Sequence, residues 1–262
     1  MLGRTPPGAS ECGFSVLELT ISIIVIGVML AGVLVPLQTQ IESRKLEETQ
    51  RLLEHARETL LSFVATYGYF PCPANSTSGW QEAPGADHVT GACPGGWHGF
   101  LPAGMIGYAP VSAQGFAVDP WGADSGRLRY AVAADTLGGI PTPFTRRAGM
   151  SAAGVPSIGA ANNLLHICSN GGGVVAGVSC GTAQTLASNA VIVMWSVGRN
   201  GGTDGGSSVH EAENPNPSGG TADRIFVSRI HSTAAAAEFD DVLAWVPSTI
   251  LVTRLMASGQ LP

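Results

Sequence analysis

The longest apolar run of the chain lies near its N-terminus. Residues 14–37 read FSVLELTISIIVIGVMLAGVLVPL, and Glu18 is the only charged residue among them. A run of this length suits a helix that crosses a membrane. We therefore expect a transmembrane helix that begins at Phe14.

Beyond Pro36 the apolar residues become periodic. A proline inside a helix removes a backbone hydrogen bond, so we expect a kink or a loosened segment at this point. The helix then continues with one apolar stripe. The stripe consists of Leu52, Ala56, Leu60 and Val64. Gly68, followed by the proline-containing segment FPCPAN, is expected to end the helix.

The rest of the chain predicts a sheet with long connections. Residues 69–117 are rich in turn-forming residues and show no useful periodicity. Short apolar runs with β-branched or large residues indicate strands. They cover residues 127–132, 164–168, 190–197 and 226–230, followed by a short helix over 247–258. The expected fold class is α+β, with a long N-terminal transmembrane helix packed on an antiparallel β-sheet head.

Composition and motifs exclude some functions. The formal net charge is −6, which argues against nucleic acid as a partner. His210 and Glu211 are not followed by the second histidine of a zinc-protease motif, and no nucleophile or phosphate-loop motif occurs. The sequence therefore predicts no enzyme.

Glu18 is an unusual residue for an apolar helix. An ionised carboxylate in such surroundings is costly and needs a positive partner. Cleavage between Gly13 and Phe14 would create an α-amine about one helical turn away from it. An ordinary signal peptide or a simple signal anchor remains an alternative. However, no small-residue cleavage site follows the apolar run, and neither alternative accounts for the acid.

The segment GFSVLEL at residues 13–19, together with the apolar run behind it, resembles the N-terminal signal of type IV prepilins and type II secretion pseudopilins. The resemblance implies cleavage after Gly13 by a prepilin peptidase and N-methylation of Phe14. It also implies that Glu18 pairs with the N-terminus of a neighbouring subunit during assembly. The leader departs from the usual pattern, because Arg4 is its only basic residue.

The same resemblance implies a domain layout. Residues 1–13 would be a leader peptide, 14–37 the transmembrane and assembly half of the helix, 38–68 its amphipathic half, and 69–262 a pilin-like globular head. The chain would be a single-pass inner-membrane protein with a periplasmic head, found in the pilus or pseudopilus after assembly. Its partners would be the prepilin peptidase, other pilin or pseudopilin subunits, the inner-membrane assembly platform and membrane lipid.

Five cysteines occur, and Cys12 would be lost with the leader. The remaining even number fits disulfides in an oxidising compartment. Proximity in the sequence favours Cys72 with Cys93 and Cys168 with Cys180. Free thiols are the alternative, whereas a metal site lacks a Cys-x-x-Cys motif or a Cys/His cluster.

Two motifs in the head also resemble type II secretion pseudopilins. One is VDPWG at residues 118–122, whose Trp121 we interpret as a core residue. The other pairs the loop SVGRNGGTDGG with the later DDVLAW, and this resemblance implies a calcium site with carboxylates from Asp204, Asp240 and Asp241. The loop is longer here than in that family, and a helix cap or simple exposure of Asp240 or Asp241 is the alternative.

These observations predict a structural subunit of a type II secretion pseudopilus or a type IV pilus. The size of the head and its long loops favour a minor component over the bulk subunit. The alternative is a pilus-tip or surface protein that contacts substrate, DNA or a host surface through residues 199–223. A membrane-anchored domain outside any filament is a third hypothesis.

Overall fold

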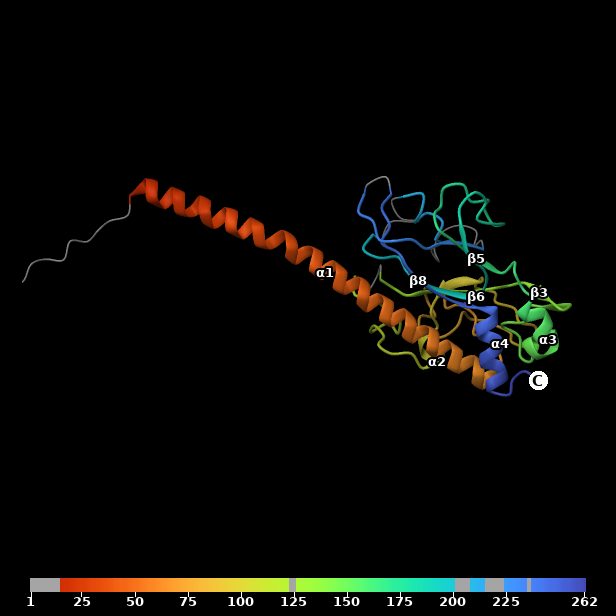
Figure 1. Ribbon diagram of the computed structural model, residues 1–262. Coiled ribbons are helices and arrows are strands. Elements are labelled where there is room, and N and C mark those ends of the chain that lie inside the picture. Colours follow the sequence, from red (N-terminus) through yellow and green to blue (C-terminus); the bar gives the residue numbers. More distant parts are fainter. Residues whose placement is uncertain (1–14, 123–125, 201–207, 215–223, 235–236) are drawn as a thin grey trace, which may run out of the picture. The chain divides into compact units, whose positions relative to one another are not determined.

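The computed structural model describes residues 15–122, 126–200, 208–214, 224–234 and 237–262, without the side chains of residues 30–39 (Figure 1). The chain divides into two compact units, residues 1–44 and 45–262. The expected leader, its cleavage site at Gly13 and the methylation site at Phe14 lie outside the described residues.

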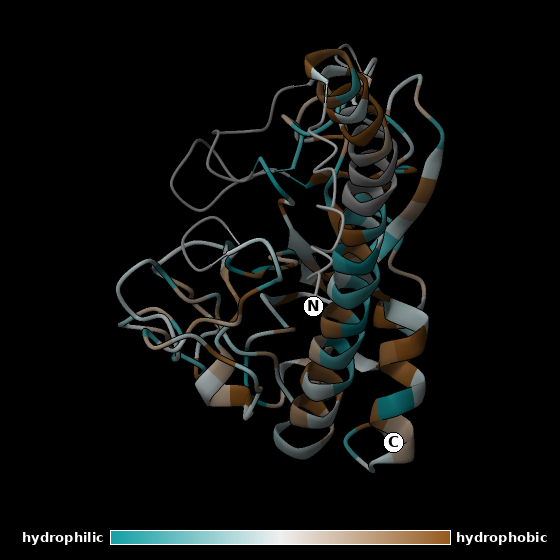
Figure 2. Cartoon of the chain, turned by 90° about the vertical axis from the view of Figure 1, so that its left-hand side faces the viewer, coloured by the Kyte–Doolittle hydropathy of each residue, from teal (hydrophilic) through white to brown (hydrophobic). Residues whose placement is uncertain are grey.

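A single helix, α1, runs from Val16 to Tyr67. In the first unit, every residue from 15 to 29 is exposed. Glu18 lies in the first helical turn. The polar residues that follow residue 40 are visible as teal turns of α1 in Figure 2.

Among the described residues, no helix combines the length and the apolar character that a membrane crossing requires. The described apolar stretch, residues 15–29, is shorter than the roughly 20 residues of a span. The helix residues from Gln40 to Arg51 are largely polar and charged. This finding overturns the expected transmembrane helix over 14–37 and the expected single-pass inner-membrane location.

In the second unit, the C-terminal part of α1 supplies one side of the core. The expected stripe is confirmed at Ala56, Leu60 and Val64, which are fully buried, whereas Leu52 is only partly buried. Gly68 ends the helix as expected. Its backbone adopts a φ of 76°, and its N–H donates to the carbonyl of Val64 at 2.8 Å.

The head is built on a six-stranded sheet. Its strands are β1 (His98–Phe100), β2 (Arg129–Val132), β5 (Leu165–Cys168), β6 (Thr185–Ser196), β7 (Ile225–Val227) and β8 (Val242–Pro247). Their order is β1-β2-β6-β5-β7, and β8 also pairs with β6. The long strand β6 is therefore central, as its apolar sequence predicted.

The sheet is mixed, which corrects the expected antiparallel fold class. All pairs are antiparallel except β5 and β7, which run parallel from His166 opposite Ile225 to Cys168 opposite Val227. Parallel neighbours require a crossover rather than a hairpin. The long connection between β6 and β7 makes this crossover possible, and its composition gave no sign of where the chain would re-enter the sheet.

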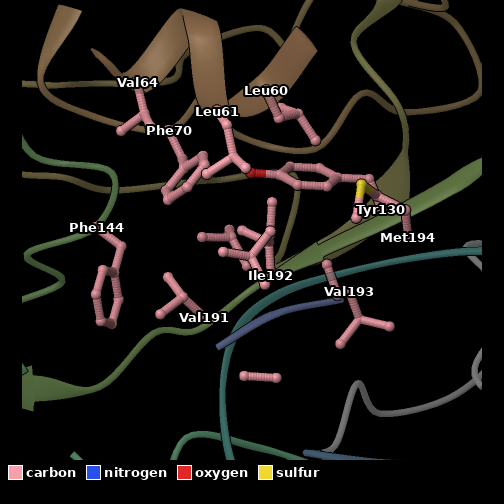
Figure 3. Close-up of a cluster of buried hydrophobic side chains, with 14 of the residues drawn as sticks. Leu60, Leu61, Val64, Phe70, Tyr130, Phe144, Val191, Ile192, Val193 and Met194 are labelled. Carbon is pink, nitrogen blue, oxygen red and sulfur yellow. The ribbon is translucent and has the colours of Figure 1, made fainter. Parts of the chain in front are cut away.

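The core lies between α1 and one face of the sheet. Figure 3 shows Leu60, Leu61 and Val64 of the helix above Tyr130 and Met194 of the strands. The hydroxyl of the buried Tyr130 donates to the carbonyl of Pro71 at 3.2 Å, which satisfies the polar atom of this large side chain.

Smaller elements complete the head. They are α2 (Ala103–Ile106), the strand pair β3 (Thr136–Leu137) and β4 (Ile140–Pro141), α3 (Gly149–Gly159) and α4 (Ser248–Ala257), with α4 beside α3 (Figure 1). The C-terminal helix is confirmed. The strand β8 before it was missed, because DDVLAW was expected to lead directly into the helix.

The two expected disulfides are confirmed. Cys72 is bonded to Cys93 and Cys168 to Cys180, with Cα–Cα distances of 5.5 and 5.4 Å. The interpretation of Trp121 as a core residue is wrong, because this side chain is only half-buried. Its neighbour Asp119 is the buried residue, and it accepts hydrogen bonds from the Trp121 N–H and from the hydroxyl of Ser196.

Candidate metal centre

Three buried carboxylates gather at one end of the sheet in the head. Glu211, Asp240 and Asp241 each offer one oxygen, and these oxygens lie within 4.8 Å of one another. Asp240 and Asp241 are two of the three residues that the sequence indicated. The third, Asp204, lies outside the described residues, so the structure does not place it.

The two aspartates are positioned by the start of strand β8. Phe239, which precedes them, exchanges two backbone hydrogen bonds of 2.9 Å with Ser232. Val242, which follows them, pairs with Ser196 at the end of β6. The pair is thus held on both sides by backbone pairing. Neither residue caps α4, whose N-cap position is Pro247.

Glu211 comes from a compact turn over residues 208–214. The Ser208 hydroxyl donates to the Glu238 carbonyl at 2.6 Å and accepts from the N–H groups of His210 and Glu211 at 3.2 and 3.3 Å. A serine at the start of a turn commonly satisfies free N–H groups in this manner. This capping carries Glu211 into the interior beside the aspartates.

The Glu211 carboxylate links two distant parts of the chain. Its Oε1 accepts from the N–H of Asp240 at 3.0 Å, and its Oε2 accepts from the side-chain amide of Asn200 at 2.9 Å. Because carboxylate oxygens have further lone pairs, these bonds do not exhaust their capacity as ligands.

Asp240 holds the least satisfied oxygen of the group. Its Oδ2 accepts from the N–H of Arg199 at 3.1 Å. Its Oδ1 is buried and has no hydrogen-bond partner among the described residues. Such an orphaned acceptor is costly unless a donor or a cation satisfies it.

Asp241 is held by an amide. Its Oδ2 accepts from the side-chain amide of Asn214 at 2.5 Å. The same Asn214 exchanges hydrogen bonds with both backbone groups of Val227, at 2.8 and 3.1 Å. Strand β7 therefore fixes the orientation of Asn214, and Asn214 fixes that of Asp241.

The electrostatics of the site favour a bound cation. Burial, reinforced by the charge of Glu211, raises the pKa of Asp240 to about 6. Burial also raises the pKa of Asp241 well above its ordinary value, and this effect outweighs the hydrogen bond from Asn214. Like charges in a buried site must either take up protons or be neutralised by a positive ion.

The chemistry of the donors fits calcium. All three carboxylates offer hard oxygen atoms, which suit Ca²⁺, whereas zinc sites usually include nitrogen or sulfur ligands. The neighbouring His210 is not part of the group of converging ligand atoms, and its Nδ1 accepts a hydrogen bond from the N–H of Gly171 at 3.0 Å. Glu211, Asp240 and Asp241 would hold the ion, with carbonyls and waters completing the six to eight oxygens.

The sequence did not indicate Glu211. It lies in a stretch that was interpreted as a long loop, 29 residues before Asp240 in the chain. A serine three residues before an acid was the local signal of the turn. The alternative that Asp240 or Asp241 simply faces solvent is wrong, since both are buried.

No protein-family model, curated protein or solved structure matches this chain at a significant level.

Proposed function

We propose that this chain is a structural subunit of a filament of the pilin or pseudopilin kind, and that it assembles through residues 15–29 of α1. The observation that carries this proposal is the complete exposure of that segment. Ten of its residues are exposed large hydrophobic side chains. They are Val16, Leu17, Leu19, Ile21, Ile23, Ile24, Val25, Ile26, Val28 and Met29.

The distribution of these side chains indicates several neighbours rather than one. Residues 23–26 are four consecutive exposed apolar residues. Successive positions of a helix point about 100° apart, so four of them face almost all directions. A dimeric coiled coil covers only one stripe of each helix. Covering this segment requires a bundle of helices, which a filament of identical or similar subunits provides.

Burial of these side chains in such a bundle would contribute favourable free energy to assembly. Removing one Val, Leu, Ile or Met side chain from water contributes about 1.5 to 3 kcal/mol. Ten such side chains per subunit give a large favourable term, from which the cost of ordering and docking the subunits is subtracted. Helices from neighbouring subunits are the occupant that this segment fits.

Glu18 would fix how far neighbouring helices are shifted along one another in the bundle. It is the only charged residue of the segment, and a carboxylate buried among apolar side chains needs a positive partner. The resemblance of residues 13–19 to prepilin signals supplies one. After cleavage by a prepilin peptidase, the N-methylated amine of Phe14 in one subunit would pair with Glu18 of the next.

Calcium would have a structural role in this subunit. An ion held by Glu211, Asp240 and Asp241 would fasten the turn over residues 208–214 to the start of β8. It would neutralise the buried acids and satisfy the Oδ1 atom of Asp240.

The assembly proposal is tested on the mature chain. Mass spectrometry of the N-terminus, after production with a prepilin peptidase, should find methylated Phe14. An unprocessed Met1 terminus would count against the proposal. Glu18→Ala should abolish incorporation into filaments while the melting temperature of the head stays unchanged.

The matched control is Glu48→Ala, an exposed acid of the same helix outside the apolar segment. Incorporation of this variant should be normal. If Glu18→Ala also assembled normally, the pairing of Glu18 with a neighbouring N-terminus would be wrong.

A further inference from the structure

The imidazole of His88 lies between two segments that are distant in the sequence. Its Nδ1 is 2.7 Å from the carbonyl oxygen of Thr145. Its Nε2 is 2.9 and 3.0 Å from the two carboxylate oxygens of Glu82. The side chains of His88 and Glu82 are only 10% and 19% exposed, so water does not readily replace these contacts.

These distances determine the protonation state that the site accommodates. A carbonyl oxygen and a carboxylate are both acceptors. A neutral imidazole donates from only one nitrogen, whereas the imidazolium donates from both. Only the protonated ring satisfies the two contacts together. In the neutral ring, one nitrogen lone pair would face an acceptor.

The contacts of Glu82 connect His88 to the first disulfide. Its Oε2 also accepts from the N–H of Cys72 at 3.1 Å. Cys72 is bonded to Cys93, and this bond closes the loop that carries both Glu82 and His88. The imidazolium therefore joins the inside of a disulfide-closed loop to the backbone of residue 145.

Backbone and hydroxyl groups extend this junction. The Thr145 hydroxyl donates to the Gly91 carbonyl at 2.7 Å, and the Arg147 N–H donates to the His88 carbonyl at 2.8 Å. A Cβ on Gly91 would lie 2.3 Å from the hydroxyl oxygen of Thr142, and the φ of Gly91 is +84°. The loop and residues 142–147 thus fit closely, and the charged ring lies at one end of the contact.

The surroundings of the imidazole have opposing effects on the pKa of His88. Burial lowers the pKa of His88, but the hydrogen bonds to Glu82 and to the Thr145 carbonyl outweigh it, so the pKa is raised. The charge of Arg147 opposes the protonated form. Asp87 interacts weakly with His88, and the ring of Tyr69 lies 4.3 Å from the imidazole without adding a charge.

We propose that His88 is a proton-operated latch, which holds the loop closed by Cys72–Cys93 against residues 142–147 when the ring is protonated and releases it when the proton is lost. The pKa of His88 is higher in the folded chain than its ordinary value of 6.5. The protonated ring therefore contributes its full stabilisation of the contact below pH 6.5. This stabilisation disappears as the pH rises through the higher folded-state value. The latch would make one face of the head responsive to pH above the ordinary histidine pKa of 6.5, whether or not the chain forms filaments.

Hydrogen exchange of the full chain tests the latch. The measured quantity is deuterium uptake of a peptide covering residues 86–93, corrected for the intrinsic pH dependence of exchange, between pH 5.5 and 8.5. We expect corrected exchange to increase several-fold as the pH rises through the folded-state pKa of His88, which lies above 6.5. A peptide from β6 should show no such step.

Two variants and a control identify the group responsible. His88→Gln keeps a polar side chain that does not titrate, so the step should vanish. Glu82→Gln removes the charge but keeps an acceptor, so the step should move to lower pH. His55→Gln, at an exposed histidine on α1, should leave the step in place.

Nuclear magnetic resonance of the His88 ring nitrogens in the wild-type chain gives an independent test that needs no variant. Both nitrogens should carry protons at pH 6, and the midpoint should exceed 6.5. A neutral ring at pH 6, a midpoint at or below 6.5, or a step that survives in His88→Gln would overturn the proposal.

Discussion

Gly198 and Asp240 are in such close contact that no other residue fits at position 198. A Cβ built on Gly198 would lie 2.2 Å from Oδ1 of Asp240, and the φ of Gly198 is +62°. This oxygen is the one without a hydrogen-bond partner among the described residues. The glycine therefore makes room for the one oxygen of Asp240 that a bound cation would satisfy.

Replacing Gly198 should damage both the fold and the metal centre. In Gly198→Ala the methyl group meets Asp240 at a backbone conformation that L-residues rarely adopt, so the variant should lose roughly 2 to 4 kcal/mol of stability. Urea unfolding of wild-type and variant chains measures the loss. Gly159→Ala is the control, because nothing lies within 4 Å of its added Cβ. Equal stability of Gly198→Ala and the wild type would contradict the contact.

Calcium should stabilise the head. A ligand that binds only the folded state at about 100 times its dissociation constant adds about 2.7 kcal/mol. We expect a higher melting temperature with Ca²⁺ than with a chelator. The increase should be lost in Asp240→Asn and in Glu211→Gln. Glu48→Gln, an exposed acid outside the site, should keep the full increase. The absence of a shift in the wild-type chain would remove these residues from a calcium site.

The pH dependence of the melting temperature, measured in the presence of a chelator, should reveal the raised pKa of Asp240. The pKa of Asp240 is raised from 3.8 to about 6 in the folded state. A raised folded-state pKa means that the carboxyl favours folding most at pH below 3.8 and that this contribution disappears as the pH rises through about 6. Melting temperatures between pH 4 and 7 should therefore fall by several degrees.

Asp240→Asn separates this effect from other titrations: its melting temperature should fall less over the same range, and the remaining fall belongs to other buried acids such as Asp241, whose pKa is also raised. Calcium should also flatten the curve above pH 6, since the ion replaces the proton. The latch at His88 acts at a higher pH, so the two effects occupy different windows. A wild-type melting temperature that rises from pH 4 to 7 would contradict the raised pKa of Asp240.

A charge in the apolar segment should prevent assembly. Ile24 is 64% exposed in the single chain, and the proposed bundle would bury it. Ile24→Asp would place an unpaired carboxylate among apolar side chains, at a cost of several kcal/mol per subunit. Light scattering after size-exclusion chromatography should then find monomers.

The control for this variant is Ile230→Asp, in which the replaced isoleucine is 89% exposed on the head. This variant should assemble as the wild type does. If Ile24→Asp and the wild type formed particles of the same size, the segment over residues 15–29 would not be the assembly surface.

Several features of the chain could be predicted from the sequence because they depend on neighbours along it. The four-residue recurrence of Ala56, Leu60 and Val64 indicated which side of the helix would be buried. The apolar run over 190–197 indicated the central strand. The short separations of 21 and 12 residues favoured the two disulfides that form. Each of these signals lies in periodicity or proximity, which the sequence displays directly.

Other features depend on how distant segments meet. The parallel pairing of β7 with β5 required knowledge of where a long connection returns to the sheet. The expected transmembrane helix was inferred from hydropathy alone. Among the described residues, no helix is long and apolar enough to cross a membrane. The predictions of an antiparallel sheet and of a transmembrane helix both relied on local sequence patterns, which do not determine the three-dimensional arrangement.

The candidate sites illustrate the same division. The sequence by itself identified the acidic pair Asp240 and Asp241 and the charged residue Glu18 in an apolar helix. Only the tertiary structure brought Glu211 to the acidic pair and the Thr145 carbonyl to His88, across 29 and 57 residues. Helical periodicity and strand patterns act over a few residues and leave traces in the sequence. Contacts across a packed core depend on the paths of all the connecting segments, and no local pattern specifies them.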